Sequence, residues 1–139
     1  MLTNSLTLAR FCSIIRRSAD GKKAICIDKE NERSILDFIN QSPRYLKKWR
    51  FITSLVLEGH RNTELYDKED INGKAKDVTA MKFFKGQENA RLYCKEKSTK
   101  DGLFIVVAVE VHERKKSTAV SKKEVTIIEK IAKYDYQIE

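Results

Sequence analysis

The sequence predicts an α+β domain in which an antiparallel sheet of about four strands carries two N-terminal helices and a C-terminal helix. Three observations lead to this prediction: strand-like runs follow one another between residues 78 and 114, two segments with helical apolar spacing precede them, and a helix-start motif follows them. The 139 residues are the length of one domain. We expect this domain to span residues 21–139, with residues 1–20 as an N-terminal extension.

The predicted strands cover residues 78–85, 90–97 and 103–114. The last of them contains LFIVVAVEV, nine residues with one charge, which is typical of a central strand that is covered on both faces. Turn-forming residues separate the runs, including the Asp101-Gly102 pair, so we expect hairpin connections. The earlier run KAICID, at residues 23–28, is the expected fourth strand.

Two predicted helices lie upstream of the hairpins. The first covers residues 30–41, where Asp28 or Asn31 is positioned to cap it and Pro43 follows its end. The second covers residues 44–58 and has one continuous apolar stripe. That stripe consists of Tyr45, Trp49, Ile52 and Val56.

The remaining segments are a C-terminal helix, a loop and the N-terminal extension. Ser121 and Glu124 form an S-x-x-E capping box, which predicts that a helix begins there. Residues 61–77 are polar and charged, so we expect a surface loop. Helical spacing also occurs in the extension, at Leu8, Phe11, Ile14 and Ile15.

The net charge of +8 favours a polyanion such as nucleic acid as the partner. The excess is spread along the chain, because the first 60 residues hold 11 Lys/Arg and 6 Asp/Glu and the other 79 hold 17 and 14. A lysine-rich surface that binds only water explains the same charge equally well.

Several classes of protein fit the sequence poorly. No run approaches the roughly 20 apolar residues of a membrane span, and the first residues lack the pattern of a signal peptide. Cys12, Cys26 and Cys94 are widely spaced, without a CxxC motif or paired histidines, so neither a zinc site nor a disulfide framework is predicted. We expect three buried cysteines, no metal or other cofactor, and a cytoplasmic protein.

The predicted strands bring several basic residues together. Alternation along the strands allows Lys82 and Arg91 to share the sheet face opposite the helices. His112 stands at the end of the central strand, shortly before a run of cations. Further basic residues in or next to the strands are Lys85, Lys95, Arg114, Lys115 and Lys116.

Metal-independent RNA cleavage is a reaction that these residue types support. The ribose 2′-hydroxyl attacks the adjacent phosphorus, a base removes its proton, cations stabilise the charge on phosphorus, and an acid protonates the leaving 5′-oxygen. Histidine titrates in the right range for proton transfer, and arginine binds phosphate through two parallel hydrogen bonds. Solvent-exposed charges and a structural histidine remain an alternative interpretation of the same residues.

From residue 22 to the C-terminus the chain resembles the RelE/HigB superfamily of bacterial toxin–antitoxin ribonucleases, especially its HigB-like, phage-derived branch. The resemblance lies in a strand with Lys82, a hairpin into ARLYC with Arg91, an apolar strand into VHERKKS, and SKKEV at the start of the last helix. It implies a RelE-like fold and a ribosome-dependent mRNA endonuclease that inhibits translation. A small helical antitoxin would be its second partner.

The resemblance also assigns roles to residues. Lys82 corresponds to a strand lysine that assists proton transfer, Arg91 to the phosphate-binding arginine, and His112 to an acid/base histidine of some HigB-like members. Arg114, or Lys115 and Lys116 beside it, corresponds to the second cation near the leaving group. Apart from the resemblance, the basic residues in or next to the strands that we expect to bind RNA are Lys85, Lys95, Lys115 and Lys116. Two positions depart from RelE, since Phe84 replaces a second lysine and Val120 replaces a tyrosine.

Three functions therefore remain open. The first is the mRNA-cleaving toxin. The second is a non-catalytic basic module that inhibits a protein or ribosomal target, which the departures at Phe84 and Val120 favour. The third is a domesticated phage protein whose partner is only its antitoxin.

Overall fold

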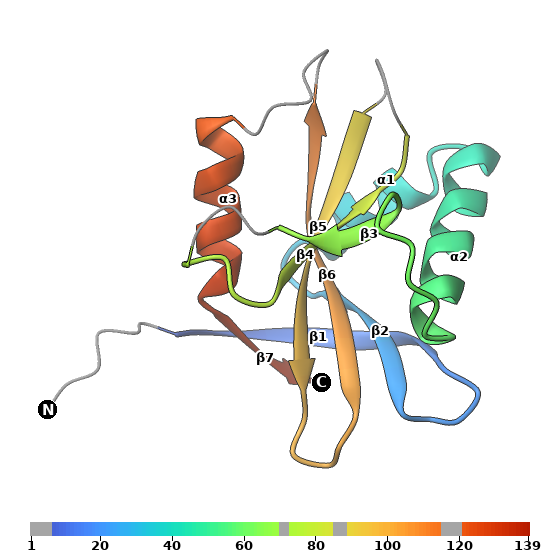
Figure 1. Cartoon of the computed structure of the whole chain (residues 1–139), viewed down its shortest axis with the longest axis vertical. Helices are drawn as coiled ribbons and strands as arrows, with labels where there is room; N and C mark the ends of the chain where they lie inside the picture. Colours follow the sequence, from blue (N-terminus) through green and yellow to red (C-terminus); the bar gives the residue numbers. More distant parts are fainter. Residues whose placement is uncertain (1–6, 70–72, 85–88, 115–120) are drawn as a thin grey trace, which may run out of the picture.

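The computed structural model describes residues 7–69, 73–84, 89–114 and 121–139. Within these ranges the chain forms seven strands and three helices. They are, in order, β1 (Leu8–Arg17), β2 (Lys23–Asp28), α1 (Glu32–Ile39), α2 (Pro43–Leu57), β3 (Tyr66–Lys68), β4 (Val78–Lys82), β5 (Asn89–Ser98), β6 (Phe104–Arg114), α3 (Lys122–Ala132) and β7 (Tyr134–Ile138). All the strands belong to one sheet, in the order β3-β4-β5-β6-β2-β1-β7 (Figure 1).

The prediction of an antiparallel sheet of about four strands is wrong, because the sheet has seven strands and is mixed. Strand β2 runs parallel to β6, and β1 runs parallel to β7. The extra strands are β1, β3 and β7. Two of these sequences are short, and that of β1 has helical apolar spacing, so none of them has a clear strand pattern. Their hydrogen-bond partners lie on other strands, and the local sequence does not reveal such pairing.

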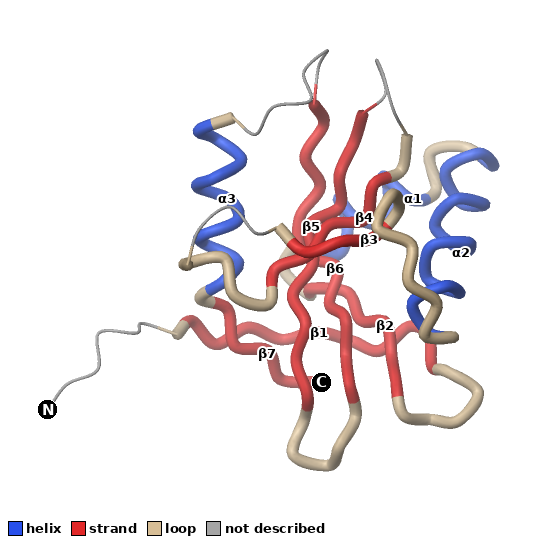
Figure 2. The backbone as a smooth tube through the Cα atoms, viewed as in Figure 1, coloured by secondary structure: helices blue, strands red, loops and turns tan. Residues whose placement is uncertain are grey.

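The segment expected to be an N-terminal helical extension is largely strand β1. It pairs with β2 on one side and with β7 on the other, as Figure 2 shows. Cys12 is fully buried in the core, whereas Phe11 and Ile15 are partly exposed on this strand. The apolar residues therefore do not form a helical stripe.

The helices lie on both faces of the sheet, and not on one face as predicted (Figure 1). Helices α1 and α2 pack over one core, which includes Ile25, Ile27 and Val106 from the strands. Helix α3 packs over a second core with Ile105 and Val107. These neighbouring residues of β2 and β6 alternate between two buried faces, which explains why the apolar runs are continuous.

The three predicted helices lie close to their expected positions. Ser42 caps α2 by accepting a hydrogen bond from the Tyr45 backbone N–H. The capping box of Ser121 and Glu124 is present at the start of α3, as predicted. At α1 the N-cap is Asn31, but its side chain makes no capping bond. The Asn31 backbone N–H instead donates to the Asp28 carboxylate.

A buried carboxylate joins both ends of the chain to the sheet. Asp28, at the end of β2, is fully buried. Arg10 of β1 donates to both of its oxygens, at 2.8 and 2.9 Å. The Tyr136 hydroxyl of β7 donates to Oδ2, and the Asn31 N–H donates to Oδ1. Burial and the bond to Asp28 raise the pKa of Tyr136 well above its usual value.

The three cysteines are free and buried, which confirms that prediction. Burial raises the pKa of the Cys94 thiol. Among the helices of the described ranges, none is both long and apolar enough to cross a membrane.

We expect Asp28→Ala to lower the free energy of unfolding by about 3–5 kcal/mol, because it leaves Arg10 without its main partner in a mostly buried position. Urea unfolding measures this loss. The matched control is Lys29→Ala, which removes an exposed ion pair with Glu139 and should cost less than about 1 kcal/mol. Equal costs for the two variants would contradict the role of Asp28.

Candidate functional site

Three of the residues predicted from the sequence lie in one row across the sheet. Lys82 of β4 is the direct cross-strand partner of Arg91 in β5, and Arg91 is the partner of His112 in β6. Directly opposite residues have Cβ atoms about 4.5–5.5 Å apart. The cation row, as we name Lys82, Arg91 and His112, therefore brings three of the predicted site residues together on one sheet face.

A β-bulge places His112 on that face. Tyr93 pairs with Glu110, but the next residue, Cys94, pairs with Ala108, so β6 contains one additional residue at this point. Such an insertion reverses the faces on which the following side chains lie. Without the bulge, His112 would share the opposite face with Ala108, and it would not join Arg91.

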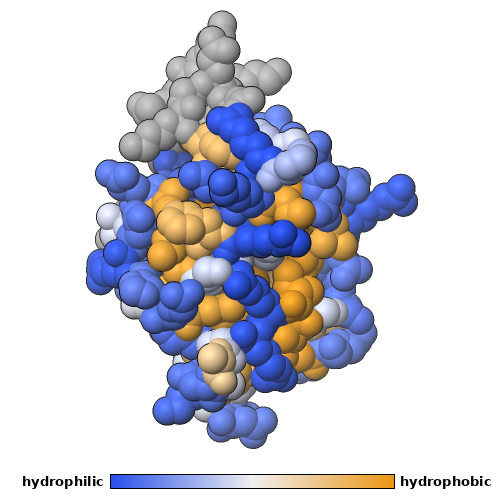
Figure 3. All heavy atoms as spheres, turned by 90° about the vertical axis from the view of Figure 1, so that its right-hand side faces the viewer, coloured by the Kyte–Doolittle hydropathy of each residue, from blue (hydrophilic) through white to orange (hydrophobic). Residues whose placement is uncertain are grey.

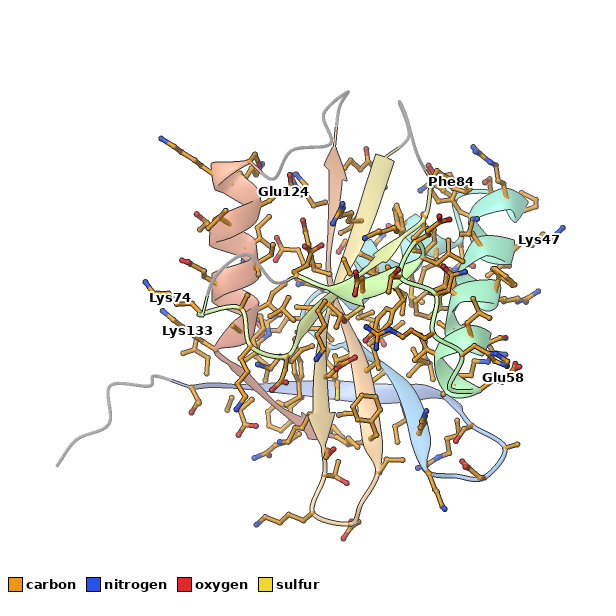
Figure 4. All side chains as sticks on the ribbon, viewed as in Figure 1. Lys47, Glu58, Lys74, Phe84, Glu124 and Lys133 are labelled. Carbon is orange, nitrogen blue, oxygen red and sulfur yellow. The ribbon has the colours of Figure 1, made fainter. Side chains whose placement is uncertain are left out.

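The face of the cation row is the one that α3 covers. Ala80 lies two residues before Lys82 on β4, and Tyr93 lies two residues after Arg91 on β5, so both are on the same face as the row. Both belong to the core under α3. The row thus lies on the face opposite α1 and α2, as predicted. The prediction is wrong for α3, which lies on the same face as the row. Figure 4 shows Glu124 at the beginning of α3, beside the upper ends of β5 and β6.

The Arg91 guanidinium forms an ion pair with a carboxylate in the loop that follows β3. Its Nη1 donates to Oε1 of Glu69, which follows β3 and is only 6% exposed. The Arg91 Nε is buried and has no hydrogen-bond partner among the described residues. A buried donor without a partner is unfavourable, so this guanidinium retains capacity for another acceptor.

His112 faces a second buried carboxylate. Its Nε2 lies 3.9 Å from Oε1 of Glu124, which is 1% exposed. The Tyr93 hydroxyl donates to Oε2 of Glu124 at 2.5 Å. Lys82, at the other end of the row, donates from Nζ to the Thr63 carbonyl oxygen at 3.3 Å.

The other predicted residues divide into two groups. Arg114 is the last residue of β6, and its side chain is outside the described part of the structure, as are Lys85, Lys115 and Lys116. Lys95 is described and lies away from the row. Its Nζ donates to the carbonyl oxygens of Ala132 and Lys76, at 2.7 and 3.2 Å, and burial lowers its pKa. Its ammonium group thus faces backbone carbonyls.

Phe84 belongs to the opposite side of the sheet from Lys82, although simple alternation places the two together. Its ring packs against Tyr45 with centroids 4.9 Å apart, and the Arg44 guanidinium carbon lies 3.8 Å from the centroid. Tyr134 and Tyr136 pack in the core under α3 and do not approach the row.

The face that carries α2 has four basic residues on that helix, Arg44, Lys47, Lys48 and Arg50, but large apolar residues are exposed there as well. Figure 3 shows hydrophilic side chains interleaved with broad hydrophobic areas on this side of the molecule. Leu36 and Phe51 are among the exposed large apolar residues. The cation row therefore remains the best candidate site.

Sequence reasoning missed the carboxylates of the site. Glu69 lies in the segment that was expected to be a surface loop, and nothing in its local pattern marks it as buried. Glu124 was recognised as a helix cap and as a match to a glutamate common at that point in RelE/HigB toxins, but not as a residue of the site. Its position three residues after Ser121 gave a signal for the cap but none for the contact with His112.

The residues of the site do not form a metal centre. In the described ranges, no group of three or more His, Cys, Asp or Glu side chains could hold a metal ion. A groove of about 880 Å³ lies at the other end of the sheet, but its lining mixes acids and bases. The charged residues that line it are Arg17, Lys22, Lys97, Lys100, Asp101 and Asp135.

No protein-family model, curated protein or solved structure matches this chain. The resemblance to RelE/HigB toxins thus stays a prediction that rests on the quoted motifs. The geometry of the cation row is independent of that resemblance.

The pair of Arg91 and Glu69 can be tested for its effect on stability. We expect Arg91→Met to lower the free energy of unfolding by about 3–5 kcal/mol, because it leaves the Glu69 carboxylate buried without its partner. The double variant Glu69→Leu/Arg91→Met should recover most of that loss, since it removes both charges. Urea unfolding of the single and double variants measures the coupling, and additive losses would contradict it.

Proposed function

We propose that this protein is a metal-independent endoribonuclease whose active site is the cation row. The observation that carries the proposal is that Lys82, Arg91 and His112 are direct neighbours across three strands, on one face. A proton-transfer group beside cations is what 2′-hydroxyl attack on phosphorus requires. The bulge in β6 supports the proposal, because bulges often re-aim a side chain at an active site.

Each member of the row has a defined task in this reaction. Arg91 binds the non-bridging phosphate oxygens and stabilises the additional negative charge that develops on them. His112 exchanges a proton with the reacting oxygens, either at the attacking 2′-hydroxyl or at the leaving 5′-oxygen. Lys82 adds positive charge at the other side of Arg91. The products carry a 2′,3′-cyclic phosphate and a 5′-hydroxyl.

The contact between Arg91 and Glu69 means that RNA must change the site when it binds. The Glu69 carboxylate accepts the hydrogen bond of Arg91 Nη1, which is the position that a phosphate oxygen would take. The Nε hydrogen remains available among the described contacts. Because Nε is buried, we infer that a phosphate group first takes the place of the Glu69 carboxylate at Nη1 and reaches the Nε donor only after that exchange.

The nature of the RNA follows from the resemblance to RelE/HigB toxins. It supports translated mRNA on the ribosome as the substrate, a cognate antitoxin as the second partner, and the cytoplasm as the place of action. The net charge of +8 fits both an RNA substrate and an acidic antitoxin.

A non-catalytic binding module is the second candidate function. It is favoured by the pairing of Arg91 with Glu69, since a neutralised arginine contributes less to phosphate chemistry. Such a module would bind ribosomes or another target and leave the message intact.

The proposal is tested by primer extension on a reporter message in a reconstituted translation reaction. We expect the wild-type protein to cut within the translated region and to leave 5′-hydroxyl ends. Arg91→Lys keeps a positive charge beside Glu69 but loses the paired phosphate contacts, so cleavage should fall about 10²–10³-fold. His112→Gln should lower cleavage roughly 10²–10⁴-fold.

The matched control is Arg33→Lys, which makes the same exchange at an exposed residue of α1 on the other side of the sheet. Its cleavage should equal that of the wild type. Blocked translation with intact message would select the binding module. Normal translation with intact message would contradict both functions.

A further inference from the structure

Glu124 does more than a capping-box glutamate requires. Its Oε1 accepts from the Ser121 backbone N–H at 3.3 Å, which completes the cap of α3. The same carboxylate is 1% exposed and accepts from the Tyr93 hydroxyl. Because burial of a carboxylate is unfavourable and a cap functions equally well in water, the cap alone does not explain this position.

The carboxylate is held from two elements. Ser121 at the start of α3 fixes Oε1, and Tyr93 of β5 fixes Oε2. Tyr93 lies two residues after Arg91, on the same face of the sheet. The group that lies beside this fixed carboxylate is the His112 imidazole, with Nε2 3.9 Å from Oε1.

We propose that Glu124 is the positioning residue for His112. This inference rests on the proposed ribonuclease function. The carboxylate faces the Nε2 edge of the imidazole and would hold the ring there when the two approach, which leaves the Nδ1 edge for the reacting oxygens. A separation of 3.9 Å is longer than a hydrogen bond, and such contacts often tighten only when substrate is bound.

The surroundings of His112 single out Glu124 among the charged groups. Glu110, two residues earlier on β6, is engaged by Lys130 of α3 at 3.1 Å. Arg91, across on β5, is engaged by Glu69, and Lys82 is one strand further away. Glu124 is the carboxylate within 4 Å of the ring among the described residues.

The inference is tested on Glu124→Gln, which retains the size of the side chain and removes its charge. The nitrogen-15 NMR spectrum of the imidazole rings reports the protonated edge of each histidine. We expect the His112 signals to shift in this variant, and kcat for RNA cleavage to fall about 10- to 100-fold at unchanged KM. His60 is the other of the two histidines in the chain. Its side chain is 64% exposed, and it serves as the internal reference.

Ser42→Ala is the matched control, since it removes the side-chain cap of α2 on the other face of the sheet and leaves Glu124 and its partners in place. It should lower the melting temperature but leave the His112 signals and kcat as in the wild type. If Glu124→Gln does not fold, Tyr93→Phe replaces it, because this variant releases Oε2 and should shift the His112 signals in the same direction.

The outcomes separate the two proposals. Unchanged His112 signals in a folded Glu124→Gln protein, with cleavage by the wild type intact, would overturn the positioning role alone. Equal effects of Ser42→Ala and Glu124→Gln on kcat would also overturn it, because a general loss of helix capping would then explain the lower kcat. A wild-type protein that cleaves no message on translating ribosomes would overturn the ribonuclease and, with it, the role of Glu124 in the reaction.

Discussion

The buried carboxylate of Asp28 is the constraint on which the arrangement of the molecule depends. It receives donors from β1, from β7 and from the first residue before α1, so both ends of the chain are tied to β2. A buried carboxylate is stable only when such partners are in place. Strand β7 follows α3 directly, and its attachment holds α3 against the sheet. The contacts of Asp28 thus support one end of α3, and those of Glu124 with Tyr93 hold the other end.

The register of the sheet is the second determinant of the site. Side chains alternate strictly along a strand, so a displacement by one residue exchanges the two faces. The bulge between the Tyr93–Glu110 and Cys94–Ala108 pairs makes that displacement once, in the middle of β6. Residues before it supply apolar side chains to both cores, and His112 after it joins Arg91. One strand therefore serves both packing and the candidate chemistry.

The sequence allowed a part of this structure to be predicted, for physical reasons that differ between elements. KAICID and LFIVVAVEV formed strands as expected, because long apolar runs have few alternatives in a core. The box of Ser121 and Glu124 located α3, since capping is local. Strand β1 was predicted wrongly, because the spacing of Phe11 and Ile15 resembles a helix while the deciding contacts come from β7. The burial of Glu69 has no local cause either: it comes from the ion pair with Arg91.

The two carboxylates of the site, Glu69 and Glu124, differ in the number of contacts that hold them. Among the described contacts, the side chain of Glu69 binds Arg91 alone, whereas Glu124 is held by Tyr93 and by the cap of α3. In the proposed reaction, an entering phosphate would compete with Glu69 for the Arg91 guanidinium and would bring its own negative charge, so the exchange would conserve the local charge balance. The carboxylate beside His112 is fixed at both oxygens by the contacts with Tyr93 and Ser121. Phosphate binding would therefore change the partner of Arg91 and leave the carboxylate beside His112 in position. The proposed reaction requires a proton-transfer group that is positioned before the substrate binds.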